Sequence, residues 1–314
     1  MDPKRILVVG SLNTDLVATI DRFPEAGETR TGTGFFTNCG GKGANQAYAA
    51  GALGGSVAMI GQVGEDDFGN AQIENLRARG VATKGILRDP DQPTGTALIG
   101  VESSGENRIV IIPGANGTLS PDSLDQNATL FEQSTLVLLQ LEIPRDTVAH
   151  ALQLATRAGA AVILDPAPAS PLPPEWFSAM TYLTPNLSEL GLLTNSSVDP
   201  DTPLESLASL AQTLCHQGAE KVIVKMGSRG ALLVNPERVE ATTAPSVEAT
   251  DSTAAGDCFN AAFATHWLAT GSEKAALEFA VHAASLSVTR TGAQAAMPSL
   301  EEVRSFQNQE ASRG

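Results

Sequence analysis

The chain has 314 residues, of which 42% are hydrophobic, and its 35 acidic and 20 basic residues give a net charge of −15. This composition is typical of a globular chain with one or two domains. The negative charge repels phosphate backbones, and an aromatic content of 4% offers few stacking surfaces. A nucleic-acid partner and an anionic membrane surface are therefore disfavoured.

Signals for targeting, disulfides and metal binding are weak in this sequence. No apolar run approaches the ~18 residues of a membrane span, and residues 1–10 lack a signal-peptide pattern, so we expect a cytoplasmic protein. Cys39, Cys215 and Cys258 are far apart, which is typical of reduced thiols. The sequence contains no CxxC or HExxH motif, and its four histidines are scattered, so a zinc site is disfavoured.

Short apolar runs alternate with helical patterns along most of the chain. The first strand is predicted over Arg5–Ser11, because the run is short, β-branched and stopped by glycine. The other expected strands are Ser56–Val63, Thr135–Leu141, Ala160–Asp165 and Lys221–Met226. The expected helices are Lys42–Leu53, Asp67–Arg79, Asp146–Ala158, Leu204–Gln217, Ala255–Thr270 and Glu273–Thr289. This alternation predicts an α/β fold with a largely parallel sheet covered on both faces.

Two segments interrupt the alternation. Leu16–Phe36 is strand-like and rich in glycine, while Thr94–Glu102 and Arg108–Pro113 flank the turn Ser103–Asn107 as a hairpin. We expect these pieces to form a small antiparallel sheet that serves as a lid over a cleft. Asp165–Pro174 is rich in proline and is predicted to be a surface loop.

The strongest chemical signal is the stretch TDSTAAGDCF at Thr250–Phe259, which leads directly into a helical pattern. Small residues at a helix start leave backbone N–H groups exposed, and these groups bind anions. Asp257 would lie in the first turn, where its carboxylate could accept a proton. The alternative is structural: Asp251 caps the helix and Asp257 only complements the helix dipole.

A second stretch, CGGKGANQA at Cys39–Ala47, precedes a helix. Its glycines allow close approach of a ligand, and Lys42 and Asn45 supply donors there. It is not a Walker A loop, because Phe36 stands where a glycine is required and no Ser or Thr follows Lys42. The alternative is a glycine turn that opens a helix.

Polar side chains also follow several strands. Asn13 and Asp15 come after the first strand, in GSLNTD, and Glu142 follows another. Ligands of open α/β sheets bind at the carboxyl ends of strands, and these side chains suit a polyhydroxylated ligand. An Asx turn is the alternative for GSLNTD.

Two further motifs indicate a nucleotide. TPNLSE places Asn186 and Glu189 on one side of a helix start, where a carboxylate could hold magnesium through water. KMGSRG, at Lys225–Gly230, follows a strand and supplies two cations near a triphosphate. Each is otherwise an ordinary helix start or turn.

The order and spacing of these motifs, together with QLEIP and VTRTGAQ, resemble the ribokinase family of carbohydrate kinases from Ile6 to about Pro298. The resemblance implies a ribokinase-like three-layer α/β sandwich with a mostly parallel central sheet and a small β-sheet lid. It implies a catalytic body of residues 1–11, 42–93 and 114–314, and a lid of residues 12–41 and 94–113. Lids of two subunits would pair in a homodimer.

The resemblance also implies ATP-dependent phosphorylation of D-ribose at O5, with Asp257 as the base and Ala254, Ala255 and Gly256 as the anion hole. The implied sugar pocket comprises Asn13, Thr14, Asp15, Gly41, Lys42, Gly43, Ala44, Asn45, Glu142 and Asp257. The implied ATP contacts are Asn186, Lys225, Met226, Gly227, Ser228, Arg229, Gly230, Gly256 and Asp257. Glu189 would lie near Mg²⁺. The implied K⁺ site comprises Asp251, Thr253, Ser287, Arg290, Gly292 and Ala296.

Three positions depart from the family pattern. Lys225 stands where members often carry Thr or Ser, and Ala296 stands where a Ser can bind the cation. Val281 occupies a position where some members place a His or Asn, so His282, one residue later, is left out of the site. These departures bear on nucleotide affinity and cation dependence.

Other functions remain open at this stage. A kinase of the same family could act on deoxyribose, fructose, adenosine or a sugar phosphate, although no Arg cluster near Asn13 and Glu142 indicates a phosphorylated acceptor. A sugar sensor without catalysis is a second alternative. A Rossmann-type dehydrogenase is disfavoured, because no GxGxxG follows the first strand.

Overall fold

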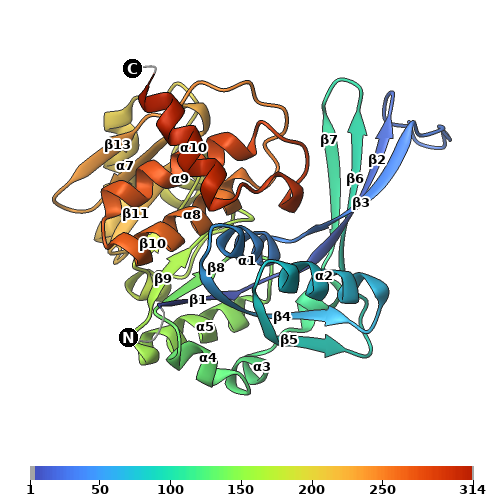
Figure 1. Ribbon diagram of the computed structural model, residues 1–314, viewed down its shortest axis with the longest axis horizontal. Coiled ribbons are helices and arrows are strands. Elements are labelled where there is room, and N and C mark those ends of the chain that lie inside the picture. The colour runs from blue at the N-terminus through green and yellow to red at the C-terminus, as the bar shows by residue number, and fades with distance from the viewer. Residues whose placement is uncertain (1–3, 313–314) are drawn as a thin grey trace.

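The computed structural model describes residues 4–312, which form two sheets and the helices around them (Figure 1). Within these residues, no helix combines the length and apolarity needed to cross a membrane. The strands are β1 Arg5–Val9, β2 Asn13–Ile20, β3 Gly34–Gly40, β4 Ser56–Gly64, β5 Ala82–Asp89, β6 Gly95–Glu102, β7 Asn107–Ile112, β8 Leu136–Leu139, β9 Ala161–Leu164, β10 Tyr182–Leu183, β11 Lys221–Lys225, β12 Ala231–Val234 and β13 Val239–Thr242. The α-helices are α1 Lys42–Ala52, α2 Asp67–Ala78, α3 Pro121–Asp125, α4 Ala128–Glu132, α5 Arg145–Ala158, α6 Leu187–Thr194, α7 Leu204–His216, α8 Ala255–Thr270, α9 Glu273–Ser287 and α10 Leu300–Ala311.

The large sheet has nine strands in the order β13-β12-β11-β10-β9-β8-β1-β4-β5. The strands from β11 to β5 run parallel, and β12 and β13 add an antiparallel edge. Because successive side chains alternate, Ile6 and Val8 of β1 enter one core, while Leu7 and Val9 enter the other. Helices α1, α2, α8, α9 and α10 cover the first face, and α3–α7 cover the second. This arrangement confirms the predicted α/β sandwich.

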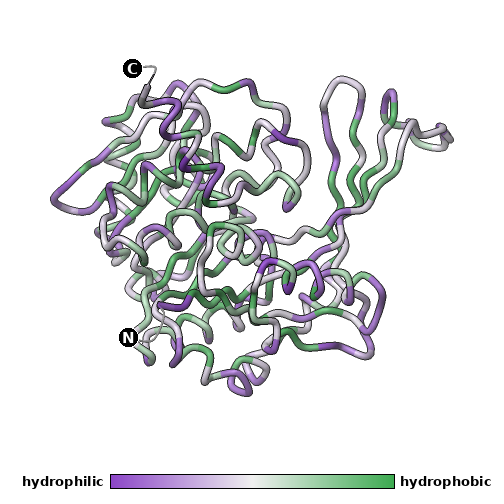
Figure 2. The backbone as a smooth tube through the Cα atoms, in the orientation of Figure 1, coloured by the Kyte–Doolittle hydropathy of each residue, from purple (hydrophilic) through white to green (hydrophobic). Residues whose placement is uncertain are grey.

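The small sheet has the order β3-β2-β6-β7 and projects from the body (Figure 1). Its outer pairs, β2 with β3 and β6 with β7, are antiparallel, as predicted. Its central pair, β2 with β6, is parallel, so the whole sheet is mixed and not antiparallel throughout. Apolar residues lie along these strands as well as inside the body (Figure 2). The small sheet therefore has apolar surface to cover.

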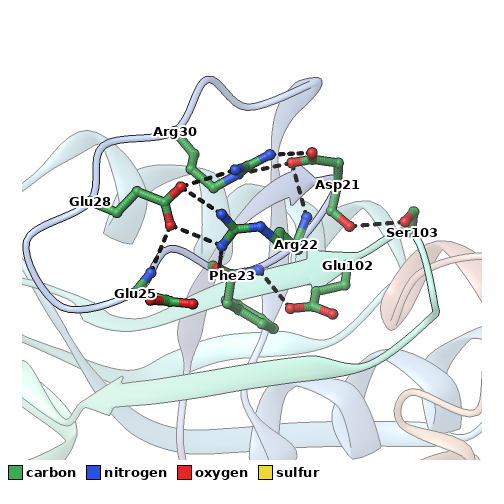
Figure 3. Close-up of polar contacts among 8 residues, drawn as sticks. All are labelled: Asp21, Arg22, Phe23, Glu25, Glu28, Arg30, Glu102 and Ser103. Carbon is green, nitrogen blue, oxygen red and sulfur yellow. Dashed lines mark hydrogen bonds and ion pairs between the residues drawn. The ribbon is translucent and has the colours of Figure 1, made fainter.

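The connection between β2 and β3 is held against the β6–β7 turn by charged and backbone groups (Figure 3). Arg22 donates to both carboxylate oxygens of Glu28, at 2.7 and 2.9 Å. Phe23 N donates to Glu102 Oε1 at 2.6 Å, and the Arg108 guanidinium lies 4.2 Å from the centre of the Phe23 ring. These contacts give the tip of the small sheet a defined shape.

Candidate active site

A cavity of about 780 Å³ lies at the carboxyl ends of the parallel strands. Its walls come from residues at or shortly after the ends of β1, β8, β9, β10 and β11, from the starts of α1 and α8, from the segment after β13, from α9 and from one face of the small sheet. This is the position where open α/β sheets bind ligands. The sequence-predicted residues that line it are Asn13, Asp15, Gly41, Lys42, Asn45, Glu142, Asn186, Glu189, Lys225, Gly227, Ser228, Gly230, Thr253, Ala254, Ala255, Gly256 and Asp257.

One end of the cavity carries the polar residues expected to bind a polyhydroxylated ligand. Asn13 and Asp15 share a face of β2, while Thr14 lies on the opposite face and does not line the cavity. Glu142 Oε2 accepts hydrogen bonds from Ser11 Oγ at 2.6 Å and from Lys42 N at 3.1 Å. Burial, with the nearby charge of Glu142, raises the pKa of Asp15 to about 7. Asp15 therefore titrates near neutral pH.

Glycine brings the start of α1 against the turn after β1. At Gly41, φ is 88°, and a Cβ atom would lie 2.6 Å from Asn13 N. A Cβ on Gly43 would lie 2.6 Å from the carbonyl carbon of Gly10. Gly43 and its neighbour Ala44 pack behind the cavity and do not line it, while Lys42 does. The two glycines therefore set the depth at which Lys42 enters the cavity.

Lys42 is surrounded by carboxylates. Burial alone would lower its pKa, but the nearby charges of Asp257, Asp165, Glu142 and Glu189 raise it above its usual value. The ammonium group thus stays charged at any physiological pH. Its positive charge offsets the negative charge of carboxylates that come from four separate segments of the chain.

The start of α8 presents a carboxylate beside free backbone donors. Asp257 is only 4% exposed, and burial raises its pKa to about 6 while Lys42 opposes that shift. Among residues 4–312, the backbone N–H groups of Gly256 and Asp257 find no hydrogen-bond partner. The N–H group of Ala255 donates to Ser252 O at 3.2 Å, so it is already occupied. A buried carboxylate, which can accept a proton, and two unpaired N–H donors of the kind that bind anions therefore meet at one helix end.

The other end of the cavity contains Asn186, Glu189 and Lys225. Asn186 Oδ1 accepts from Glu189 N, and Glu189 Oε2 accepts from Asn186 N, each at 2.8 Å, which forms a capping box at the start of α6. Burial raises the pKa of Glu189, and the charge of Lys225 opposes this shift. Lys225 Nζ donates to Asp165 Oδ1 at 2.8 Å and would lie 3.3 Å from a Cβ on Gly256. Lys225 thus lies beside the start of α8.

Some predicted residues lie away from the cavity. Met226 is buried in the second core, and Arg229 donates to the carbonyl oxygens of Pro200 and Thr202 at 2.6 and 2.8 Å. His282, which the prediction left out, bonds Glu278 O through Nδ1 at 2.7 Å. Arg229 is therefore engaged with a neighbouring loop.

Of the residues predicted to hold K⁺, the structure brings Asp251, Thr253 and Gly292 together, and only Thr253 of the whole set lines the cavity. The Asp251 carboxylate accepts from Thr253 N at 2.9 Å and from Gly292 N at 2.8 Å. Ser287 Oγ donates to Ala284 O, the Arg290 guanidinium pairs with Glu302, and Ala296 is buried. In the part of the chain that the structure describes, no group of three or more His, Cys, Asp or Glu side chains is arranged to hold a metal.

Two polar residues with a part in the site, Asp165 and Gln46, were not identified as site residues from the sequence. Asp165, which ends a predicted strand and begins a predicted surface loop, is 2% exposed, lines the cavity and pairs with Lys225. Its position directly after β9 was the available signal, since Glu142 was identified by a similar strand-end position. Gln46 Nε2 donates to Asp257 Oδ1 at 3.0 Å, but nothing in the sequence singles it out from the rest of α1.

A polar pocket, a buried carboxylate and a helix start with free donors, all at one sheet edge, define a small-molecule enzyme of the α/β class. The pfkB carbohydrate kinase family matches residues 3–300. The ribokinase of Bacillus subtilis is 42% identical over 305 residues, covering 96% of this chain and 98% of that protein. The deoxyribokinase of Salmonella typhi is 36% identical over 302 residues, with the same coverage. The structure of Arabidopsis thaliana ribokinase complexed with ribose and ATP has a TM-score of 0.91 at 33% identity, covering 98% of this chain and 99% of that chain.

The chain therefore belongs to the pfkB family of carbohydrate kinases, and it is a sugar kinase. The family and the fold expected from the motifs are confirmed.

Ala254, the residue before α8, provides a test of backbone strain at the site. Its φ of 59° lies in the left-handed region, which a Cβ atom disfavours. We expect Ala254→Gly to increase the free energy of unfolding by about 1 kcal/mol, measured by urea denaturation. The control Ala255→Gly lies within the helix and should decrease it by up to about 1 kcal/mol. Equal effects of the two substitutions would contradict strain at Ala254.

Proposed function

We propose that this protein transfers the γ-phosphoryl group of ATP to the O5 hydroxyl of D-ribose. The observation that carries the proposal is Asp257, a buried carboxylate beside two free N–H groups, in one cavity with Asn13, Asp15 and Glu142. The similarity to the ribokinases of Bacillus subtilis and Arabidopsis thaliana supports ribose as the acceptor.

In this proposal Asp257 acts as a general base. A pKa of about 6 leaves its carboxylate mainly ionised at neutral pH, and it accepts the proton of the attacking hydroxyl. Asn13, Asp15 and Glu142 bind the other hydroxyls and so orient the sugar. Phosphoryl transfer depends mainly on such positioning and on charge stabilisation, since it needs little covalent help from the protein.

Negative charge on the transferring group is offset locally, although the whole chain is acidic. The unpaired N–H groups of Gly256 and Asp257 are proposed to donate to the phosphoryl group, and donors of this kind contribute about 2.7–4 kcal/mol each in other enzymes. Lys42 and Lys225 add two ammonium groups within the same cavity. Asn186, Gly227, Ser228 and Gly230 line the remainder and are proposed to bind the nucleotide.

The cavity fits magnesium bound together with phosphates. Glu189 is a carboxylate on the Asn186 side of the cavity, and magnesium is commonly held by one or two carboxylates with water and phosphate oxygens. Magnesium would neutralise phosphate charge there. For K⁺, we propose the two loops that contain Asp251 and Gly292, where the backbone N–H groups of Thr253 and Gly292 donate to the Asp251 carboxylate and keep it in place. Ala296 offers no side-chain oxygen to that site.

The small sheet, residues 12–41 and 94–113, is proposed to be a lid that excludes water from the reaction. Ile99, Ile109 and Ile111 on one of its faces line the cavity. On its other face, four large apolar side chains are exposed: Phe35, Leu98, Val110 and Ile112. Exposed apolar surface of this kind is typical of protein interfaces, so we propose a homodimer in which two lids pair.

Deoxyribose is the second candidate acceptor, because the Salmonella typhi deoxyribokinase is 36% identical over 96% of this chain. Fructose and adenosine remain alternatives without a specific observation in their favour.

A cytoplasmic location stays a prediction, and the three free cysteines agree with it.

Asp257→Asn tests the reaction and the base together. Purified enzyme is assayed by coupled ADP release with MgATP and D-ribose, deoxyribose, fructose or adenosine, with and without K⁺. We expect the unaltered enzyme to prefer D-ribose and to be stimulated by K⁺. We expect Asp257→Asn to lose about 10²–10⁴ in kcat, because a general base contributes that much, while still binding ribose in calorimetry. Near-normal turnover by Asp257→Asn would rule out the base.

Because the pKa of Asp15 is raised, we expect ribose binding to depend on pH. Hydroxyl groups that donate to its carboxylate favour the ionised form, whereas burial raises the pKa of the free enzyme's Asp15 to about 7. Binding should therefore release a proton at pH 6, and affinity should fall about tenfold per pH unit below 7. Calorimetry in buffers of different ionisation enthalpy measures this release, and Asp15→Asn should abolish it. Proton uptake on binding would contradict the prediction.

Val110→Asp tests the lid dimer. A carboxylate on the exposed apolar face should disfavour pairing, because the interface would bury an unpaired charge. We expect a dimer for the unaltered chain and a monomer for Val110→Asp in size-exclusion chromatography with light scattering. Val239→Asp is the matched control, since Val239 is equally an exposed valine but lies on β13. A monomeric unaltered chain would refute the interface.

A further inference from the structure

A network of buried amides lies behind Asp257, on the side away from the cavity. Gln46 Nε2 donates to Asp257 Oδ1 at 3.0 Å and to Asp165 Oδ2 at 3.3 Å. Gln46 Oε1 in turn accepts from Gln140 Nε2 at 2.7 Å. Gln46 is 1% exposed and does not line the cavity, so it is unavailable to a substrate.

The second oxygen of Asp257 is held from the cavity side. Asn45 Nδ2 donates to Asp257 Oδ2 at 3.0 Å, and Asn45 Oδ1 accepts from Gln294 Nε2 at 3.2 Å. Gln294 Oε1 accepts from Asn75 Nδ2 at 2.5 Å. Each carboxylate oxygen of Asp257 is thus fixed by one amide whose own orientation is set by another.

The chemistry of an amide explains why a glutamine suits this position. Gln140 donates to the oxygen of Gln46, so the NH₂ group of Gln46 must face the carboxylates and cannot exchange places with its oxygen. The two hydrogens of that group then serve Asp257 and Asp165, which would otherwise repel each other. Asp165 is paired with Lys225 on its other oxygen. Gln46 therefore connects the base to the Lys225–Asp165 ion pair.

We propose that Gln46 is a positioning residue that fixes the rotation of the Asp257 carboxylate and favours its ionised form without touching the substrate. This inference rests on the proposed role of Asp257 as the base. A fixed carboxylate needs no reorientation when the hydroxyl arrives, which lowers the barrier to proton transfer. The negative charge of the neighbouring Asp165 by itself favours the protonated form of Asp257. The Gln46 donor between the two carboxylates opposes this effect, because it stabilises the ionised form.

The charged or titratable groups around Asp257 are Lys42 on α1, Asp165 after β9, Cys258 on α8 and Lys225 at the end of β11, which is paired with Asp165 beside the start of α8. Burial raises the pKa of Asp257, and Asp165 adds to this, whereas Lys42, Asn45 and Gln46 lower it. Removal of the Gln46 donor must therefore raise the pKa of Asp257. A purely structural role for Gln46 would not move that pKa in a defined direction.

The test compares Gln46→Met with the unaltered enzyme across pH 5–9, under MgATP and D-ribose. Methionine keeps the length of the side chain but donates no hydrogen bond. We expect the acid limb of the kcat profile to move up by about one pH unit, since a hydrogen bond to a charged group contributes about that much. At pH 9, where Asp257 is ionised in either protein, a kcat loss of about tenfold should persist from lost orientation. The KM for ribose should change by less than about twofold, because Gln46 does not line the pocket.

Gln62→Met is the matched control. Gln62 is also a buried amide, at 8% exposed, and its Nε2 donates to Asp89 Oδ2 at 3.0 Å and to Thr118 Oγ1 at 2.9 Å, away from the cavity. We expect this variant to lose stability but to keep the acid limb in place. If Gln46→Met does not fold, Gln140→Met replaces it, and a smaller shift of the limb in the same direction is expected.

The outcomes separate this inference from the proposed function. A limb that stays in place in the Gln46 or Gln140 variant, whether or not kcat falls, overturns the positioning role. Asp257→Asn is measured in parallel. If that variant retains turnover, the proposed role of Asp257 as the base is wrong. If Asp257→Asn is inactive but the acid limb of the kcat profile does not move in Gln46→Met, only the inference about Gln46 is refuted.

Discussion

Lys42 is the buried charge on which the electrostatics of the cavity depend. Four carboxylates from different segments act on it, and each of them lies in a partly or wholly dehydrated place where an unpaired charge is costly. Its position follows from the close approach of α1 to the turn after β1, which Gly41 and Gly43 permit. Asp15 shows what happens to a buried carboxylate that lacks such a nearby cation. It faces Glu142 without a compensating cation, and its pKa rises to about 7.

Parallel topology explains how residues so distant in the sequence meet. Strands of the large sheet that run parallel end shortly before these residues or at them: Asn13, Glu142, Asp165, Asn186 and Lys225. All such strand ends lie at one edge of the sheet. The anionic ligand that a kinase needs is met there by helix starts and ammonium groups, not by the surface as a whole. A net charge of −15 is therefore compatible with nucleotide binding, because the local field of the cavity differs from that of the chain.

Much of the fold was predictable because its central strands are apolar on both faces and its helices have regular patterns. Edge strands were harder: β5 contains Lys84 and Arg88 and β13 is half exposed, so neither gives an apolar run. Asp165 was predicted at the junction of a strand and a surface loop but not as a site residue, because the proline-rich sequence after it does not reveal whether it is buried. Gln46 was missed since its importance arises only when α1 and α8 pack together, which no local pattern shows. Thr14 was grouped with its neighbours although strand alternation turns it away.

The end of the small sheet nearest the body, at the start of β2, is fixed by buried hydrogen bonds. Asn116 Nδ2 donates to Asn13 Oδ1 at 2.8 Å and to Leu12 O at 3.0 Å, and Gln72 Nε2 donates to Asn13 O at 2.5 Å. These buried amides anchor the start of β2 to the body, while the hydrogen bonds found at the far end of the sheet, among residues 4–312, join its own strands and the exposed groups of its tip. A movement of the lid would therefore begin beyond Asn13. Asn13, which we propose to bind the sugar, would then keep its place relative to Asp257, and the apolar wall of Ile99, Ile109 and Ile111 would open and close.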